Sequence, residues 1–173
     1  MNRVVLHRLV LLAVCALAAS LPLAASSWAQ DRPVLLATGE AGGDSSAEAE
    51  VRAAVVSLFD AMRAADTTAA RAVFHAGATL QSVVPTEDGY RVAPGDVDRF
   101  IAALGQPHDA AWDERIGPIR VEIDGGLAHA WMDYAFYLGD AYSHCGVNSM
   151  QLAQTDTGWR ILHVVDTRRA QCE

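Results

Sequence analysis

The chain has 173 residues, enough for one ordinary domain with a buried core, and it is acidic, with a net charge of −8. Its 13 basic residues, all Arg, are outnumbered by 21 Asp and Glu. Because excess negative charge repels phosphate backbones and anionic lipids, this composition argues against nucleic acid as a partner and against a membrane partner for the mature chain.

Residues 1–29 have the pattern of a secretory signal peptide. Arg3 and Arg8 give a basic start, residues 9–17 an apolar run, and Ser27-Trp28-Ala29 a small-x-small cleavage site. A retained N-terminal anchor is the alternative, although the apolar stretch is short for a membrane span. Cleavage after Ala29 would give a secreted or periplasmic protein, and the loss of two Arg would change the net charge from −8 to −10.

The first part of the remaining chain is predicted to be helical. Residues 30–46 are small, polar and Gly-rich, which is typical of a flexible leader, and residues 47–173 are expected to form one domain. A helix capped by Ser45 or Ser46 should run to about residue 65, followed by a short helix that begins at Asp66. The apolar positions of the first of these helices recur at three- and four-residue spacings: Val51, Ala54, Val55, Leu58, Phe59 and Met62.

The rest of the chain is dominated by strands. A hairpin is predicted from residues 78–84 and 90–92, then a third helix that begins at Asp96, then a strand over residues 116–123. Three further strands, at about residues 128–138, 142–152 and 159–168, are separated by turns rich in Gly and Asp. This order predicts an α+β domain in which about three N-terminal helices pack on one face of a curved antiparallel sheet.

The register of the last three strands predicts which side chains share a face. Turns at Gly139 and at Asp156-Thr157 would place Leu138 opposite Tyr142, Phe136 opposite His144, Leu152 opposite Ile161 and Met150 opposite His163. A slip of one residue would exchange the faces. The predicted inner face holds Met132, Tyr134, Phe136, His144, Gly146, Asn148, Met150, Leu152, Ile161, His163, Val165 and Thr167.

Five segments of the second half of the chain carry a resemblance to a known family. They are Trp112-Asp113-Glu114-Arg115-Ile116, Trp131-Met132-Asp133-Tyr134-Ala135-Phe136-Tyr137-Leu138, Ser143-His144-Cys145-Gly146-Val147, Gly158-Trp159-Arg160-Ile161 and Asp166-Thr167-Arg168-Arg169. With these segments the chain resembles the nuclear transport factor 2-like superfamily, and within it the exported SnoaL-like proteins of the lumazine-binding branch. The resemblance covers residues 47–172 and implies a sharply curved sheet wrapped around helices as a cone, a cystatin-like roll open at one end to a pocket. It implies more about fold than about function.

An apolar cavity with a few convergent polar groups is the usual form of a small-ligand site. The inner face predicts such a pocket for a small apolar or aromatic ligand, and Gly146 is expected to leave room for it. The alternative for each His is an ordinary, partly buried side chain with a hydrogen bond to backbone or Tyr. The predicted pocket residues are Tyr134, Phe136, His144, Asn148, Met150 and His163.

An enzyme of the isomerase, cyclase or hydrolase type is a second hypothesis. The resemblance to ketosteroid isomerases and polyketide cyclases implies a base in the cone, for which His144 would serve with Tyr134 as a donor. Asp133 and Asp166 are predicted on the outer face, where Arg168 or Arg169 could pair with them. A third hypothesis is a protein interaction module whose interior is filled by its own side chains. No cofactor and no metal are expected, because the other His residues lack zinc-ligand spacing.

Two cysteines remain after the signal peptide, Cys145 and Cys172. In an oxidising compartment they could form a disulfide, which requires the tail to double back, or remain two unpaired thiols. A catalytic pair of Cys145 with His144 is excluded, because adjacent strand residues point to opposite faces. The outer face is predicted to form a homodimer interface, because it carries Trp131, Tyr137, Val147, Leu162 and Val164.

Overall fold

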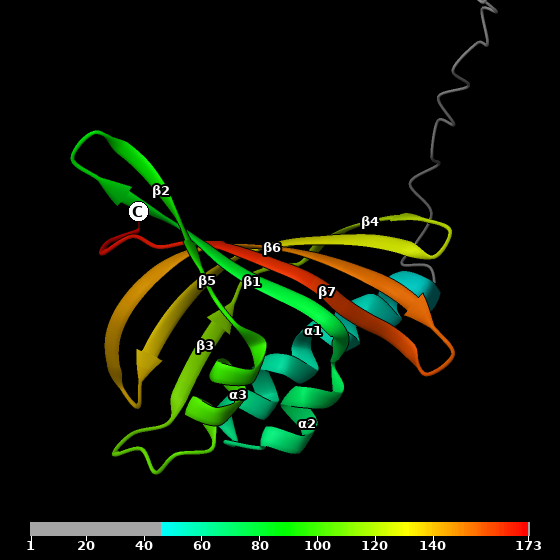
Figure 1. Ribbon diagram of the computed structural model, residues 1–173, viewed down its shortest axis with the longest axis horizontal. Helices are drawn as coiled ribbons and strands as arrows, with labels where there is room; N and C mark the ends of the chain where they lie inside the picture. Colours follow the sequence, from blue (N-terminus) through cyan, green and yellow to red (C-terminus); the bar gives the residue numbers. More distant parts are fainter. Residues whose placement is uncertain (1–45, 173) are drawn as a thin grey trace, which may run out of the picture. The chain divides into compact units, whose positions relative to one another are not determined.

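The computed structural model describes residues 46–172, shown in Figure 1. The predicted signal peptide, with its cleavage at Ala29, and residues 30–45 of the predicted leader lie outside the described residues. Three helices, α1 (Ser46–Arg63), α2 (Thr67–Ala72) and α3 (Val97–Leu104), lie on one side of a curved sheet. None of the described helices is both long enough and apolar enough to cross a membrane.

The helices begin where the capping residues predict. The side chain of Asp66 accepts a hydrogen bond from the backbone N–H of Ala69 at the start of α2. Asp96 accepts one from Arg99 N–H at the start of α3. Such caps satisfy backbone donors that the first turn of a helix leaves unpaired. Both helix starts are therefore set by local sequence.

Seven strands form one sheet in the order β2-β1-β7-β6-β5-β3, with β4 also paired to β5. Five of the six strand pairings are antiparallel, but β1 pairs with β7 in parallel, which corrects the expectation of a wholly antiparallel sheet. A long connection does not impose the antiparallel geometry of a hairpin. The strands are β1 (Phe74–Thr86), β2 (Gly89–Pro94), β3 (Trp112–Ile116), β4 (Arg120–Asp124), β5 (Leu127–Leu138), β6 (Ala141–Thr155) and β7 (Gly158–Thr167).

The strand predicted over residues 116–123 is instead two strands, β3 and β4, on the same edge of β5. Ile116 pairs with Tyr134 and Arg120 pairs with Trp131, so the connecting residues contain one more residue than β5 has opposite them. Gly117 N–H donates to the carbonyl of Asp133 at 2.8 Å. Pro118 has no N–H to extend the ladder, so the strand is interrupted there.

The meander register is partly as predicted. Phe136 pairs with His144, and Leu152 pairs with Ile161. The first hairpin closes with Leu138 opposite Ala141, rather than Tyr142, because the register shifts next to Phe136. The shift affects only the end of the hairpin. From the Phe136–His144 pair onward the two strands pair as predicted, so the residues of β5 and β6 on the inner face are those predicted.

A second irregularity changes the face of most of β7. Between Ile161 and His163 the register shifts, so Met150 pairs with Val164, and His163 pairs with Gln151. Since side chains alternate between faces, the shift turns Val164 and Asp166 inward and His163 outward. The prediction that placed His163 inside and Asp166 and Val164 outside is therefore wrong. The extra residue of the bulge is the physical reason.

The apolar core lies between α1 and one end of the inner face of the sheet. Val51 and Val55 of α1 are completely buried, as are Ala130 of β5, Leu152 of β6 and Ile161 of β7. α1 contacts β3, β4, β5 and β7, so one helix covers several strands. The other end of the same face, toward α3 and the start of β6, is not filled in this way.

Candidate functional site

A cavity of about 830 Å³ opens at this unfilled end of the inner face. Its wall comes from α1, α3 and six strands, and most of it is apolar. Phe59, Phe74, Phe100, Trp112 and Phe136 supply aromatic side chains, with Leu58, Met62, Leu80, Met150 and Val164 between them. A volume of this size is in the range of small-molecule sites. The interior is therefore not filled by the side chains of the described domain.

Polar groups from three strands gather at one end of the cavity. Glu114 comes from β3, Asn148 from β6 and Asp166 from β7. Asn148 pairs with Asp166 on the adjacent strand, so these two side chains lie side by side. In the sheet β5 lies between β3 and β6, and the Asn148–Glu114 contact spans it. The side chain of Asn148 is buried, with 4% exposed, and its Nδ2 donates to Glu114 Oε1 at 2.7 Å.

The pKa of the Glu114 carboxyl is strongly raised. Burial, together with the negative charge of Asp166, raises the pKa of its carboxyl from 4.5 to about 7, although the Asn148 hydrogen bond and Arg168 act in the opposite direction. Desolvation disfavours a carboxylate, which explains the direction. A carboxyl with a pKa near neutrality can both accept and give a proton near pH 7.

Asp166 is held by several donors. Tyr134 donates its hydroxyl hydrogen to Asp166 Oδ2 at 3.1 Å, Arg168 Nε donates to the same oxygen at 2.9 Å, and Ser82 Oγ donates to Oδ1. The side chain is 9% exposed. A buried carboxylate with this many partners is compensated in place.

His144 is half-buried on the cavity wall. Its ring lies 5.0 Å from the Phe136 ring and 5.8 Å from the Tyr134 ring, centroid to centroid. Burial lowers the pKa of His144, and the nearby Arg168 lowers it further, so the ring is neutral at pH 7. Its Nδ1 lies 3.1 Å from Ser143 Oγ. With the Ser143 hydroxyl donating, the ring proton would be on Nε2.

The structure brings four of the six predicted pocket residues to the cavity: Phe136, His144, Asn148 and Met150. Tyr134 is not part of its wall, because its hydroxyl donates to Asp166 and to the carbonyl of Thr167 at 2.9 Å. Burial and the negative charge of Asp166 raise the pKa of Tyr134. Tyr134 therefore supports Asp166 rather than lining the pocket.

His163 is the sixth predicted residue, and it is not part of the cavity wall. The bulge in β7 turns it outward, where its Nε2 lies 3.3 Å from Gln81 Oε1. It is half-buried. An ordinary His with a side-chain partner, the alternative given above, describes its surroundings.

Gly146 does not leave room for a ligand, which corrects that expectation. A Cβ atom placed there would lie 1.8 Å from the carbonyl oxygen of Thr167 and 2.9 Å from Cε1 of Tyr134. The space beside Gly146 is taken by the end of β7 and by the Tyr134 ring. The glycine is required for the close approach of backbone to backbone.

Sequence reasoning missed Glu114, Asp166 and Arg168. Glu114 could have been found, because in the segment Trp112-Asp113-Glu114-Arg115-Ile116 it alternates with two apolar residues and so shares their face. Asp166 had no such signal. The run Ile161-Leu162-His163-Val164-Val165 has no clean alternation that would locate the bulge.

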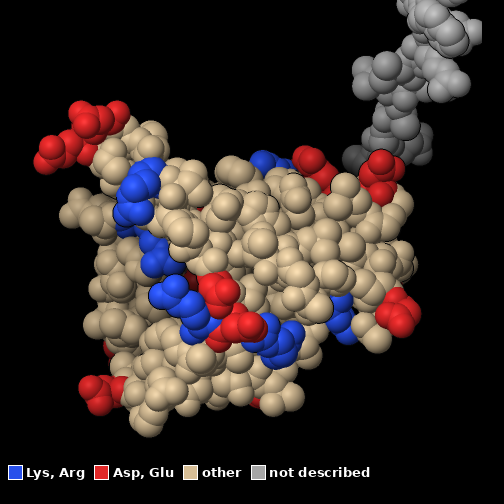
Figure 2. All heavy atoms as spheres, in the orientation of Figure 1, with Lys and Arg blue, Asp and Glu red and all other residues tan. Residues whose placement is uncertain are grey.

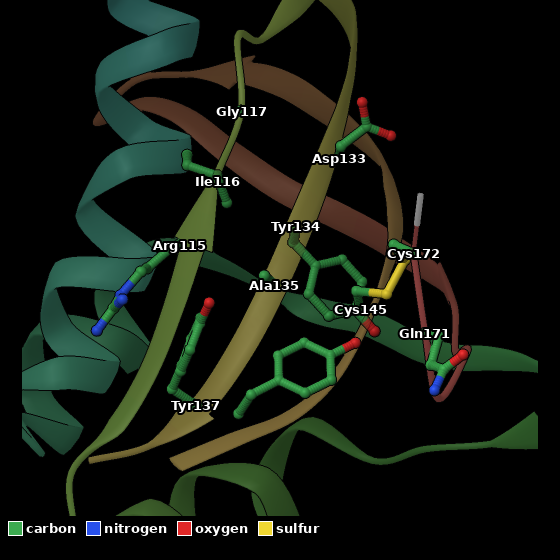
Figure 3. A pocket seen from close by; sticks show the side chains of 11 residues that line it. Arg115, Ile116, Gly117, Asp133, Tyr134, Ala135, Tyr137, Cys145, Gln171 and Cys172 are labelled. Atoms are coloured by element: carbon green, nitrogen blue, oxygen red, sulfur yellow. A yellow bond between two sulfur atoms is a disulfide. The ribbon is translucent and has the colours of Figure 1, made fainter. Parts of the chain in front are cut away.

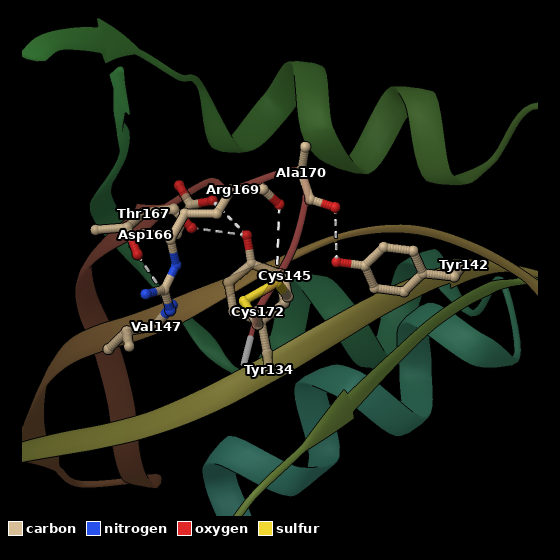
Figure 4. Close-up of a disulfide and its surroundings, with 9 residues drawn as sticks. All are labelled: Tyr134, Tyr142, Cys145, Val147, Asp166, Thr167, Arg169, Ala170 and Cys172. Atoms are coloured by element: carbon tan, nitrogen blue, oxygen red, sulfur yellow. Dashed lines mark hydrogen bonds between the residues drawn. A yellow bond between two sulfur atoms is a disulfide. The ribbon is translucent and has the colours of Figure 1, made fainter.

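The two cysteines form a disulfide, Cys145–Cys172, with Cα atoms 6.1 Å apart (Figure 4). Arg169 pairs with Cys145, and the tail then turns back. Tyr142 donates its hydroxyl hydrogen to the carbonyl of Ala170 at 3.1 Å. The tail is thus fixed against the outer side of β6, which rules out Cys145 as a nucleophile.

An open groove of about 850 Å³ lies on the outer side of the sheet beside this disulfide (Figure 3). The Arg115 guanidinium lies 4.0 Å from the centroid of the Tyr137 ring, and its Nε donates a hydrogen bond to Asp113 Oδ2 at 2.8 Å. Asp133 and Gln171 also line it. Glu114, whose pKa is raised, and its hydrogen-bond donor Asn148 lie in the inner cavity, so we take that cavity as the candidate site.

The surface charge is mixed on the face seen in Figure 2, where Arg (blue) and acidic (red) side chains gather next to one another in a band. Ion pairs among the described residues include Arg71 with Asp98 and Arg63 with Asp60. Within residues 46–172, no group of three or more His, Cys, Asp or Glu is arranged to hold a metal ion.

No protein-family model matches the sequence, and no curated protein matches it. Solved structures do match in fold. A nuclear transport factor 2-like protein with a cystatin-like fold from Novosphingobium aromaticivorans has a TM-score of 0.58 and 15% identity, covering 73% of this chain and 84% of that one. The chain has the nuclear transport factor 2-like fold. At this identity the similarity establishes fold alone.

Two further structures with the nuclear transport factor 2-like fold show the same relation. A superfamily protein from Salmonella enterica serovar Typhimurium has a TM-score of 0.54 and 20% identity, with 72% of this chain and 92% of that one covered. A candidate dehydratase from Streptomyces avermitilis has a TM-score of 0.53 and 14% identity, with 71% and 96% covered. The SnoaL-like, lumazine-binding assignment stays a prediction.

Proposed function

We propose that this domain binds a small, mainly apolar or aromatic molecule in the inner cavity. The observation that carries the proposal is the cavity itself, about 830 Å³ with aromatic walls and Glu114, Asn148 and His144 at one end. Apolar walls supply affinity through burial, and a few polar groups orient the ligand.

The test is binding of N-phenyl-1-naphthylamine, a neutral aromatic probe whose fluorescence increases in apolar surroundings. Ala103 lines the cavity from α3, whereas Ala102 is exposed on the same helix and does not line it. We expect Ala103→Trp to fill the cavity and abolish probe binding, and Ala102→Trp to leave binding as in the wild type. Equal binding by both variants would contradict the proposal.

A second function, proton transfer on a bound carbonyl compound, is favoured by the pKa of Glu114 near 7. In this function Glu114 takes a proton from carbon, and the Nε2–H of neutral His144 donates to the oxygen that becomes negative. The roles differ from those predicted from sequence, where His144 was the base and Tyr134 the donor. Tyr134 already donates to Asp166 and Thr167.

This second function is tested by exchange of the α-protons of 2-tetralone in D2O, followed by proton NMR. The wild type should accelerate exchange above the buffer rate, and Glu114→Gln should remove the acceleration. Asp133→Asn, on the outer face, removes the same charge and should retain it. Exchange at the buffer rate with wild-type protein would exclude this function for ketones of that size.

We also propose that the mature protein acts outside the cytoplasm, secreted or periplasmic. The signal-peptide pattern of residues 1–29 supports this, as does the Cys145–Cys172 disulfide, since disulfides persist in oxidising compartments. Intact mass measurement on the protein from the exported fraction would test it. A mass beginning at Gln30 is expected, and a full-length mass in the cytoplasmic fraction would contradict it.

A homodimer through the outer sheet face is the proposed assembly. Trp131 and Tyr142 keep 39% and 45% of their surface exposed, and Tyr137 and Val147 lie beside them on that face. Val164 is no longer part of this patch, because it lines the inner cavity. Sedimentation should show a dimer at micromolar concentration, and Trp131→Glu should give a monomer. A wild-type monomer would contradict the proposal.

A further inference from the structure

The two carboxyl groups at the polar end of the cavity differ in how they are compensated. Asp166 has a charged partner, Arg168, and two hydroxyl donors, Tyr134 and Ser82. The negative charge of Asp166 and the positive charge of Arg168 therefore offset each other at close range. This pair leaves little demand for a further cation.

Glu114 has no such partner in the part of the chain that the structure describes. Its one hydrogen bond among residues 46–172 comes from the neutral amide of Asn148. Its neighbour two residues away on β3 is Trp112, and its cross-strand partner on β5 is Phe136. An ionised Glu114 would thus be a negative charge on a wall of aromatic rings, offset only by the Asn148 hydrogen bond and by Arg168, which is already paired with Asp166. Ring faces also attract cations.

We infer that the cavity selects ligands whose polar end is a protonated amine and discriminates against matched ligands that end in a carboxylate. The ammonium group would donate to Glu114, while the aromatic or apolar body of the ligand contacts Phe136, Met150 and Phe59. This inference rests on the proposed binding function and specifies its ligand class. It concerns the charge at the deep end of the cavity.

Several other charged and titratable groups surround the Glu114 end of the cavity. Tyr134 comes from β5, His144 from β6, Asp166 from β7 and Arg168 from the residue that follows β7, while Asp96 and Arg99 lie at the start of α3. The cavity residues of α1 are Leu58, Phe59 and Met62, which carry no charge. Arg99 is exposed, so water screens its charge more than that of the enclosed Glu114.

Three probes of one shape test the inference: 1-naphthylmethylamine, 1-naphthylmethanol and 1-naphthoic acid. Their dissociation constants are measured by titration calorimetry at pH 8. An opposite charge nearby shifts a pKa by about one unit or more, which corresponds to about tenfold in affinity. We expect the amine to bind at least about tenfold more tightly than the alcohol, and the acid to bind most weakly.

Glu114→Gln should bring the amine to the affinity of the alcohol. Asp133→Asn removes one carboxylate from the outer face, so it has the same net charge as Glu114→Gln and should keep the wild-type order. In the wild type the preference for the amine should increase as pH rises through about 7, as Glu114 ionises. Protonation of His144 at low pH would also weaken binding of the amine. The same pH titration on Glu114→Gln measures the contribution of His144 alone and so separates it from that of Glu114.

Each outcome is decisive. Equal affinities for amine and alcohol, or an order unchanged in Glu114→Gln, would overturn the inference and leave the binding function standing. If Asp133→Asn lost the preference as fully as Glu114→Gln, overall charge rather than Glu114 would be the cause, and the inference would be wrong. If none of the three probes bound, the proposed binding function itself would fail.

Discussion

The two ends of the inner sheet face differ in what covers them. At one end, α1 packs on β4, β5 and β7, and Leu152 and Ile161 are completely buried among apolar neighbours. At the other end, β6 and β7 carry Asn148 and Asp166 and border a cavity. One strand, β6, contributes Leu152 to the first end and His144 to the second. Stability and the candidate chemistry are thus separated along a strand rather than between layers.

The largest expected effect comes from the closed end. Leu152→Ala should lower the free energy of unfolding by about 2 to 5 kcal/mol, because a fully buried side chain leaves a cavity that its neighbours fill only in part. Urea denaturation measures it. Leu138→Ala, at the exposed edge of the open end, is the matched control and should cost well under half as much. Equal costs would contradict the distinction between the ends.

The disulfide should have the next largest effect. Cys172→Ser removes the bridge that fixes the tail to β6, across a sequence separation of 27 residues, and should cost about 2 to 4 kcal/mol. Thermal unfolding with and without reducing agent measures the loss. Reductant should destabilise the wild type but not the variant. A wild type unaffected by full reduction would show that the tail does not depend on the bridge.

Gly146→Ala tests the close contact between β6 and the end of β7. A Cβ there meets the Thr167 carbonyl, which is backbone and can move only if the strand end moves, so a cost of about 1 to 3 kcal/mol is expected. Gly126→Ala is the control, since its nearest contact is 3.9 Å away. If Gly146→Ala were as stable as the wild type but bound N-phenyl-1-naphthylamine more weakly, the prediction that Gly146 leaves room for a ligand would be restored.

Glu114→Gln should have the smallest effect on stability, and the effect should depend on pH. The pKa of Glu114 is raised from 4.5 to about 7 in the folded protein, so the folded state binds more protons than the unfolded state between these values. Wild-type stability relative to Glu114→Gln should therefore fall as pH rises from about 4.5 to about 7, and then level off. A change of about 1 to 2 kcal/mol is expected after allowance for partial exposure.

Urea titrations of both proteins across this pH range measure the difference. A stability of the wild type that rises with pH relative to the variant would mean that Glu114 is stabilised as a carboxylate by a partner. In that case the claim that Glu114 is less well compensated than Asp166 would be disproved.

The sequence predicted the fold because its strongest signals are local. The caps at Asp66 and Asp96 and the apolar spacing from Val51 to Met62 determine the helices, and Gly-rich turns separate the strands of the meander. The parallel pairing of β1 with β7 was not predicted, because strands distant in sequence carry no turn that sets their direction. Pairings of this kind depend on the packed structure.

The candidate site was predicted in part for a related reason. His144, Asn148 and Met150 follow from alternation along β6, which has no irregularity between them. Asp166 and His163 exchanged faces because a single bulged residue near Leu162 shifts everything after it. Whether a bulge forms depends on cross-strand packing, as in the contact of Gly146 with Thr167, and a short apolar run does not reveal it.

Methionine methyl NMR tests the central claim, that the open end of the inner face binds a small molecule. Met62 and Met150 line the cavity, whereas Met132 is buried outside it, so the protein contains its own control. With ¹³C-methyl methionine, N-phenyl-1-naphthylamine should shift the Met62 and Met150 resonances to saturation and leave Met132 in place. Saturable probe binding with no change at Met62 and Met150 would contradict the account.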